Sequence, residues 1–252
     1  MAKTPYAHVA LKKALSRAIH LYNMIEAGDR IVVGLSGGKD SMTLLHLLLY
    51  LRQKAPIDFY LKPIYIDPGF EGGFGAELLS YVNDLGLDLH VELTDHGLVA
   101  HSDANTENPC FLCSRLRRKR LFELAREFNC TKLALGHHKD DLIETFMMNI
   151  FYAGEVSTML PYQEMFGGAF AVIRPMAYAE SAHIKRYVAD MQLPVYKNPC
   201  PSSGITKRQE VRDILNELYY KNRKVRGNIF HAMSNIKLDY LLKKDRTGKR
   251  TH

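Results

Sequence analysis

Ile31-Val-Val-Gly-Leu35, followed directly by Ser36-Gly37-Gly38-Lys39-Asp40-Ser41, decides the fold of this 252-residue chain. The apolar run predicts a short, buried parallel strand, and a strongly apolar helix is expected over 41–53. Between them, the two glycines let backbone N–H groups turn toward an anion. The helix N-terminus and the lysine add positive charge. The segment therefore predicts a phosphate-binding loop between a strand and a helix.

The acidic residue of this loop indicates a metal ion. Asp40 separates the lysine from Ser41, so the loop departs from the Walker pattern. A carboxylate in a phosphate site repels the ligand unless a divalent cation bridges them, which predicts Mg²⁺ with a pyrophosphate group. An ordinary strand-to-helix turn is the alternative, because glycines and an acidic first helical turn are common there. The complete six-residue string favours the nucleotide site.

Strands and helices alternate along the chain and predict an α/β fold. An N-terminal helix is expected over 7–28. The fold class is a doubly wound, mostly parallel five-stranded sheet with a C-terminal helical extension. The expected further strands lie at 60–66, 87–93, 132–135 and 170–173, and the expected further helices at 77–85, 114–128 and 140–152.

Two more segments follow strand ends, where ligands of such sheets bind. Asp67 precedes Pro68-Gly69 and is either a turn initiator or a nucleotide contact, and the residues leave both open. In Gly136-His-His-Lys-Asp-Asp141, Asp140 suits a helix cap and Asp141 a metal or phosphate role, with the histidines structural or beside the ribose. One site built from three segments is predicted.

Three of the four cysteines indicate a cofactor. Cys110 and Cys113 form a Cys-x-x-Cys pair, and Cys200 is kept out of a helix by the prolines on either side. A thioredoxin-like motif normally opens a helix after the first strand, and a structural zinc site needs a fourth ligand that the sequence does not show nearby. Three thiolates suit an iron–sulfur cluster with one iron open to sulfide or substrate. Cys130 is expected to be a small buried residue.

Composition and charge favour a cytoplasmic protein with a polyanionic partner. The chain is 46% hydrophobic and 24% charged, with a net charge of +7. We expect no membrane span and no signal segment. Ser114–Arg120 carries five cations that we place in the first two turns of a helix, where they oppose the helix dipole. A solvated face is the usual explanation, but this placement favours contact with RNA phosphate or substrate. Further cations occur at Lys207, Arg208, Arg212 and 221–226.

These segments resemble the tRNA 2-thiocytidine synthetase family of the PP-loop ATP pyrophosphatases, from about Ala18 to Ile236. The resemblance rests on the phosphate-binding loop, Cys110-x-x-Cys113-Ser-Arg-Leu-Arg-Arg118, Gly136–Asp141, Ile173-Arg-Pro175 and Cys200. It implies a tRNA sulfurtransferase that cleaves ATP to AMP and pyrophosphate. Such an enzyme adenylates O2 of an anticodon-loop cytidine and replaces that oxygen with sulfur, giving 2-thiocytidine.

The resemblance also implies roles for individual residues. The three cysteines would ligate a 4Fe–4S cluster. Lys39 would stabilise phosphate charge, and Asp40 and Asp141 would help hold Mg²⁺. The expected ATP contacts are Ser36, Gly37, Gly38, Lys39, Asp40, Ser41, Asp67 and Gly136. The implied partners are tRNA, a sulfur donor (a cysteine desulfurase or free sulfide) and a second copy in a homodimer.

The domain prediction has three parts: an N-terminal helical segment at 1–28, an ATP-binding core at 29–193 that carries the Cys-x-x-Cys pair, and a basic helical region at 194–252 that carries the third cysteine.

Other functions remain open at this point. Proline after the third cysteine also occurs in uridine-thiolating relatives, although the terminal zinc modules of those relatives are not found here. A tRNA uridine or a small molecule is therefore an alternative substrate. The Cys-x-x-Cys pair disfavours a lysidine-type ligase or an amidotransferase, since a nitrogen nucleophile needs no soft ligands. The intact loop disfavours a non-enzymatic RNA-binding or redox-sensing protein.

Overall fold

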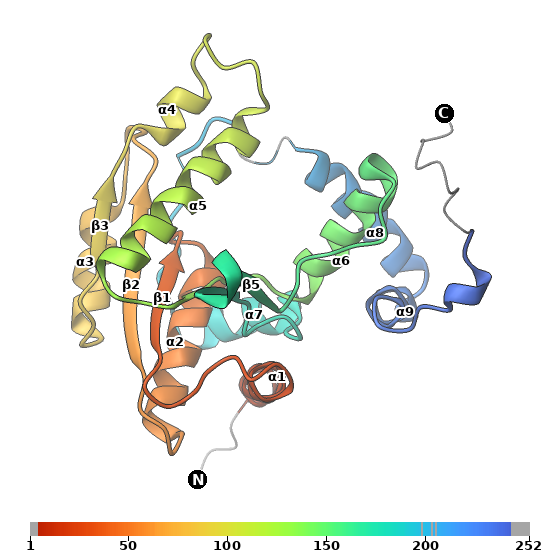
Figure 1. Ribbon diagram of the computed structural model, residues 1–252, viewed down its shortest axis with the longest axis horizontal. Helices are drawn as coiled ribbons and strands as arrows, with labels where there is room; N and C mark the ends of the chain where they lie inside the picture. Colours follow the sequence, from red (N-terminus) through yellow and green to blue (C-terminus); the bar gives the residue numbers. More distant parts are fainter. Residues whose placement is uncertain (1–4, 198, 203, 205, 243–252) are drawn as a thin grey trace.

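A computed structural model describes residues 5–197, 199–202, 204 and 206–242 (Figure 1). Its sheet has the strand order β3-β2-β1-β4-β6-β5. Neighbouring strands are parallel except β5 and β6, which are antiparallel. The strands are β1 (Arg30–Leu35), β2 (Tyr60–Asp67), β3 (His90–Leu93), β4 (Lys132–Ala134), β5 (Tyr162–Met165) and β6 (Phe170–Ile173).

Helices cover both faces of the sheet and form the C-terminal extension. They are α1 (Tyr6–Leu21), α2 (Lys39–Lys54), α3 (Gly75–Asp84), α4 (His96–Ala100), α5 (Pro109–Glu127), α6 (Lys139–Met148), α7 (Ser181–Asp190), α8 (Lys207–Lys221) and α9 (Lys224–Ala232). A π-helical turn, η1 (Asn149–Ala153), continues α6, and the 3₁₀ turns are η2 (Phe166–Gly168) and η3 (Leu238–Tyr240).

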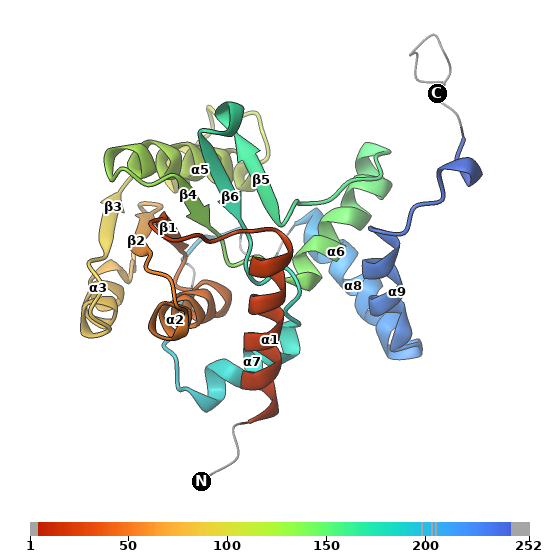
Figure 2. The same cartoon turned by 60° about the horizontal axis from the view of Figure 1, so that its bottom comes forward.

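Side chains of β1 alternate between two hydrophobic cores, because successive strand residues point to opposite faces. Ile31, Val33 and Leu35 enter the larger core, which α1, α2, α3 and α7 cover. Val32 enters the core under α5, where it joins Leu121. Figure 2 shows α5 on one side of the sheet and these other helices on the opposite side. Burying one such aliphatic side chain contributes about 1.5–3 kcal/mol, so β1 is fixed between two layers.

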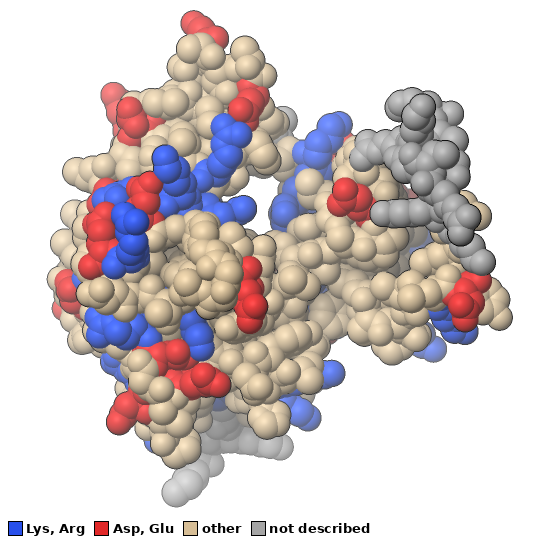
Figure 3. All heavy atoms as spheres, viewed as in Figure 1, with Lys and Arg blue, Asp and Glu red and all other residues tan. Residues whose placement is uncertain are grey.

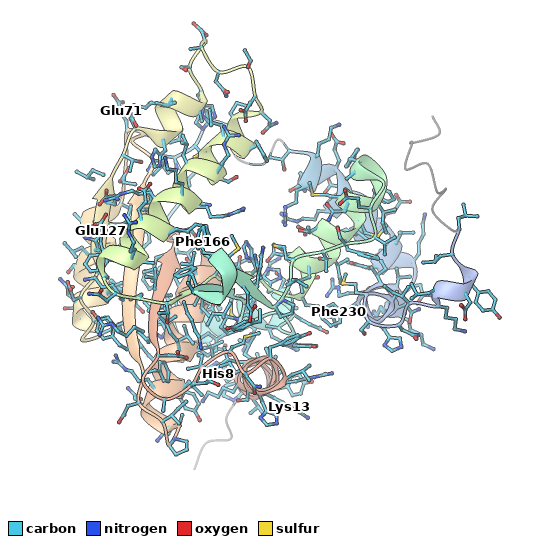
Figure 4. The ribbon with its side chains drawn as sticks, in the orientation of Figure 1. His8, Lys13, Glu71, Glu127, Phe166 and Phe230 are labelled. Atoms are coloured by element: carbon cyan, nitrogen blue, oxygen red, sulfur yellow. The ribbon has the colours of Figure 1, made fainter. Side chains whose placement is uncertain are left out.

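A third, smaller core attaches the C-terminal helices. Ile143 of α6 is buried together with Val211 and Leu215 of α8. Phe230 of α9, labelled in Figure 4, packs edge-on against Tyr178 at 5.5 Å between ring centroids. The extension is therefore held against α6 and the connection between β6 and α7.

The five predicted strands are all present, and β5 is an additional edge strand. The N-terminal helix prediction was too long: α1 ends at Leu21, because Asn23 adopts a φ of +46°. Met24 and Ile25 are buried in the connection to β1. The helix predicted over 114–128 begins earlier, at Pro109, where the Asn108 side chain accepts hydrogen bonds from the first-turn N–H groups. No helix in the described parts of the chain is long and apolar enough to cross a membrane.

Candidate nucleotide and cysteine site

The loop after β1 is held open by its two serines. The Ser36 N–H donates to Ser41 Oγ at 3.1 Å, and the Ser41 hydroxyl donates to the Gly38 carbonyl at 3.0 Å. Gly37 has a φ of +71°, and a Cβ at this position would lie 2.4 Å from the Phe74 ring. Only glycine fits both the conformation and the space. The predicted phosphate loop is therefore preorganised at the start of α2.

The loop after β4 packs directly against this first turn. A Cβ on Gly136 would lie 3.0 Å from backbone atoms of Asp40, so glycine permits the close approach. His138 caps α6 through Nδ1, which accepts from the Asp140 N–H at 3.2 Å. Its Nε2 then carries the proton and lies 3.5 Å from an oxygen of Asp40 and 3.5 Å from one of Asp141. His138 thus joins the two carboxylates predicted to hold Mg²⁺.

A cavity of about 760 Å³ opens between these loops, α5 and α8. Figure 3 shows it as a hollow with Lys and Arg side chains on both sides. Of the predicted site residues, those lining it are Ser36, Asp40, Ser41, Gly136 and Asp141.

Four of the predicted ATP contacts do not line this cavity: Gly37, Gly38, Lys39 and Asp67. Lys39 donates to both carboxylate oxygens of Asp40, at 2.6 and 2.7 Å, and lines a neighbouring cavity of about 450 Å³. Asp67 is buried, and its carboxylate accepts a hydrogen bond from the Gly69 N–H at 2.9 Å, as the turn interpretation predicts. The nucleotide role of Asp67 stays a prediction, and Ile66 is the β2 residue that lines the cavity.

A buried arginine was not singled out as a site residue, although its motif contributed to the resemblance. Arg174 lines the cavity, and in the described structure its hydrogen bonds go to neutral acceptors. These are His137 Nδ1 at 3.2 Å, the Leu160 carbonyl at 2.5 Å and Gln163 Oε1 at 3.5 Å. Burial lowers the pKa of Arg174 to about 10, so it remains a cation at neutral pH. Because none of the described carboxylates pairs with this cation, this wall of the cavity attracts an anion.

Burial and neighbouring charges also set the protonation states of Asp141 and His137, which line the same cavity. Burial, followed by the Arg174 cation, lowers the pKa of His137 to about 4, so its imidazole is neutral. Burial raises the pKa of Asp141, but the His138 side chain, a hydrogen bond from the His138 N–H at 2.8 Å and the Arg208 cation together outweigh it and hold the pKa below its ordinary value. Asp141 is therefore ionised, as a metal ligand needs to be.

Two cations of α5 face the cavity. Arg117 and Arg118 line it, whereas Arg115 pairs with Glu107 and Arg120 with Glu92 on other surfaces. Because α5 begins at Pro109, these cations lie beyond the first turn, and the expectation that they oppose the helix N-terminus was wrong. The placement of Arg117 and Arg118 in the cavity is the observation that favours ligand contact.

The three cysteines predicted to act together converge in the fold. The Ser202 hydroxyl oxygen lies 3.5 Å from Cys110 Sγ and 3.4 Å from Cys200 Sγ. Burial raises the pKa of Cys113, the Arg117 cation opposes this, and the two other cysteines raise it further. Cys130 is buried in the core under α5, as predicted.

These thiols fit an iron–sulfur group better than a single metal ion. In the described residues, no three His, Cys, Asp or Glu side chains are arranged to hold one metal ion. Cys110 and Cys200 contact one hydroxyl group, and Cys113 is close enough to interact electrostatically with both. Soft sulfur donors are the ligand chemistry of an iron–sulfur cluster. A small cavity of about 60 Å³, lined by Ser36, Cys113 and Arg117, connects them to the phosphate loop.

Comparisons with known proteins agree with this arrangement. A family model described as a PP-loop domain matches residues 10–218. The tRNA-cytidine(32) 2-sulfurtransferase of Pelobacter propionicus is 39% identical over 94% of this chain and 90% of its own length. That of Bordetella petrii is 40% identical over 93% of this chain and 73% of its own.

Two solved structures share the fold. The U34-tRNA thiolase NcsA from Methanococcus maripaludis, solved with its 4Fe–4S cluster, has a TM-score of 0.74 at 24% identity, covering 95% of this chain and 82% of that chain. The NH3-dependent NAD synthetase from Campylobacter jejuni has a TM-score of 0.52 at 14% identity, covering 94% and 95%. From the family match and the relatives' identity, the chain belongs to the PP-loop proteins and, among them, to the family of the tRNA-cytidine(32) 2-sulfurtransferases.

Proposed function

We propose that the protein is an ATP-dependent tRNA sulfurtransferase that converts cytidine 32 of tRNA to 2-thiocytidine. The observation that carries the proposal is the convergence of three cysteines beside a phosphate loop, with Ser36 and Cys113 lining one small cavity. Activation by ATP and delivery of sulfur can then take place at one substrate base. The names of the relatives supply the base and its position.

On the nucleotide side, the loop amides and the hydroxyls of Ser36 and Ser41 bind the ATP phosphates. Asp40 and Asp141, which His138 joins, would hold Mg²⁺, and this ion would supply positive charge beside the leaving pyrophosphate. Lys39 is paired with Asp40 and would turn toward the phosphates when that carboxylate holds the ion. These residues together favour adenylation of the base at O2.

On the sulfur side, Cys110, Cys113 and Cys200 hold the 4Fe–4S cluster. When bound, this group supplies a coordination site for the incoming sulfide. Arg117 lines both the large and the small cavity, so its cation lies between the nucleotide loop and the thiols. It orients the adenylated base and stabilises negative charge formed during sulfur attack.

The remaining parts of the proposal concern partners and organisation. The tRNA backbone binds the cations around the cavity, and a cysteine desulfurase or free sulfide provides the sulfur. We retain the homodimer, the cytoplasmic location and the three-part division at residues 28 and 193 as predictions. The connection after α7 bears on that division, because the Tyr196 N–H donates to the Gly37 carbonyl at 2.9 Å. The start of the C-terminal region thus supports the phosphate loop.

Mass spectrometry of tRNA nucleosides tests the proposed function. A deletion strain should lose 2-thiocytidine, and the wild-type gene should restore it. Loss of a thiouridine instead would keep the chemistry and move the target to uridine. Unchanged thionucleosides would reject tRNA thiolation.

A further inference from the structure

An exposed pair of aromatic residues lies at the end of α6, next to the central cavity. Phe151 and Tyr152 belong to the π-helical turn η1, and they are 48% and 53% exposed. Their rings meet edge-on, with 6.4 Å between centroids, and an edge-on pair cannot enclose either ring. Turns of π-helix are rare and are frequently found at functional sites. Two large rings are therefore presented to solvent by an unusual local structure.

The same turn is anchored in the wall of the cavity. Asn149 and Thr158 line the cavity, and Asn149 Nδ2 donates to the Ser157 carbonyl at 2.9 Å. The Thr158 hydroxyl donates to the Leu142 carbonyl of α6 at 2.7 Å. These hydrogen bonds close the segment into a compact loop. The base of this loop is part of the cavity, and the aromatic pair is on its exposed side.

Contacts to α8 fix one ring and surround the pair with positive charge. The Tyr152 hydroxyl donates to Glu210 Oε2 at 3.1 Å, and Lys207 Nζ lies 5.5 Å from the centroid of the Tyr152 ring. The neighbouring Arg208 lines the cavity and donates to Thr145 Oγ1 at 3.1 Å. Figure 1 shows the end of α6 beside the start of α8. The first turn of α8 thus places cations both beside the aromatic pair and in the cavity.

We propose that Phe151 and Tyr152 form a stacking platform for an unpaired base of the tRNA anticodon loop, outside the cavity that receives the target cytidine. This rests on the proposed function, because it presupposes that tRNA is the substrate. Proteins recognise single-stranded RNA by stacking its bases on aromatic rings and binding its phosphates with cations. Both kinds of group are adjacent here, whereas the centre of a protein–protein interface is depleted of charged residues. A base stacked on the platform holds the loop in place while the target base enters the cavity.

A single tryptophan tests this contact directly, because the chain contains no tryptophan. All samples are full-length protein reconstituted anaerobically with iron and sulfide. Phe151→Trp places an indole on the platform, and its emission is followed as an anticodon stem-loop RNA with cytidine 32 is added. Stacking of a base should quench this emission, and a fully paired RNA duplex should leave it unchanged.

Tyr60→Trp is the matched control for the emission measurement. Tyr60 is 39% exposed and has the Arg30 guanidinium 4.3 Å from its ring centroid, so it also combines an open ring with a cation. It is the first residue of β2, however, and lies at the end of the parallel strands opposite to the cavity. Its emission should not respond to the stem-loop.

Binding measurements give the size of the contribution. Phe151→Ala should weaken binding of the stem-loop by about 5- to 150-fold, the range expected for one stacked base, and leave duplex binding unchanged. Because stacking releases no counterions, the slope of log K against log salt should stay as in the wild type. Tyr60→Ala should bind both RNAs like the wild type.

The possible failures are distinguishable. Unchanged stem-loop affinity of Phe151→Ala, while the wild type binds the stem-loop, would overturn the platform and leave the proposed function standing. Quenching of Phe151→Trp that follows protein concentration instead of RNA would also overturn it and assign the pair to a contact between copies of the chain. Wild-type protein that binds neither the stem-loop nor intact tRNA would overturn both the platform and the proposed function.

Discussion

Cys200 and Cys130 have the same side chain in different surroundings, which separates a cofactor role from a packing role. Cys200 lies with Cys110 around Ser202, whereas Cys130 is 4% exposed in an apolar core. Cys200→Ala should lose cluster iron and 2-thiocytidine. Cys130→Ala should retain both and lose only about 1 kcal/mol of unfolding free energy, for a small cavity. Iron and sulfide analysis, nucleoside mass spectrometry and urea unfolding measure these effects. A full cluster in Cys200→Ala would contradict the ligand assignment.

His137 should make the stability of the protein depend on pH. Its pKa is lowered from 6.5 to about 4 by burial and Arg174, so the unfolded chain binds a proton that the folded protein does not. The free energy of unfolding therefore falls as pH decreases from about 6.5 to about 4, and is unaffected by this group at higher pH. Between about pH 7 and pH 5 the loss from this residue should be about 2 kcal/mol.

Comparison with His137→Asn isolates this effect from other titrating groups. Urea unfolding at about pH 7 and about pH 5 gives, for each cluster-free protein, the free energy of unfolding that is lost on acidification. This loss should be smaller for the variant than for the wild type. A difference in unfolding free energy that is the same at both pH values reflects the lost hydrogen bond from Arg174 and is not evidence for titration of His137. Equal pH dependence in both would show that His137 is not buried as a neutral imidazole.

At the scale of elements, one ion pair fastens α8 to α6. Arg212 donates to both oxygens of Glu144, at 2.7 and 3.0 Å, and Glu144 is 4% exposed. In Arg212→Ala, the Glu144 carboxylate keeps only Arg208, at 3.6 Å. The free energy of unfolding should fall by about 2 kcal/mol, because a buried charge loses its main partner.

Arg186→Ala is the matched control, since it removes an exposed arginine from an i,i+4 pair with Asp190. The loss of unfolding free energy in this control variant should stay below about 0.5 kcal/mol. Chemical denaturation compares the two variants. Equal losses would mean that the Arg212–Glu144 pair does not stabilise the packing of α8 on α6.

Local sequence patterns explain which strands and helices could be predicted from the sequence. The apolar runs of β1, β2, β4 and β6 are visible in sequence because these strands are buried on both faces. β3, at one edge of the sheet, is only partly buried and has no such run. Tyr162-Gln-Glu-Met165 has no such run, because β5 pairs at the sheet edge and is only partly buried. The start of α5 was predictable, since Asn108-Pro109 is a strong helix-start signal. It was missed because the helix was predicted to begin at Ser114, directly after the cysteine pair.

The site was predictable where its residues form one contiguous motif. Ser36, Asp40 and Asp141 line the cavity as the strand ends predict. The direction of Lys39 depends on a side-chain pairing that the motif does not encode. Cys110 and Ser202 are 92 positions apart, and only the packing of α5 against the chain after Pro199 brings them together. No local sequence pattern predicts such a contact.

For the whole molecule, the arrangement of charge predicts how tRNA binds. Arg117 and Arg118 of α5 and Arg208 of α8 line the central hollow, and α5 and α8 lie on opposite sides of the molecule in Figure 1. Figure 3 shows Lys and Arg side chains on both sides of the hollow, so a phosphate backbone entering it meets cations from both sides. Each phosphate contact should contribute about 0.7–0.9 to the slope of log K against log salt. Arg118→Ala should therefore weaken tRNA binding and reduce the magnitude of that slope by about this amount.

Lys119→Ala is the control for charge alone. Lys119 neighbours Arg118 in the sequence, but it pairs with Glu123 at 3.9 Å on the outer surface of α5, with its side chain 75% exposed. Both substitutions remove one positive charge, so the net charge of +7 falls equally. Binding measured over a series of salt concentrations should change its slope for Arg118→Ala and not for Lys119→Ala. Equal changes would show that tRNA responds to overall charge, whereas the predicted difference requires that its backbone enters the hollow beside the phosphate loop.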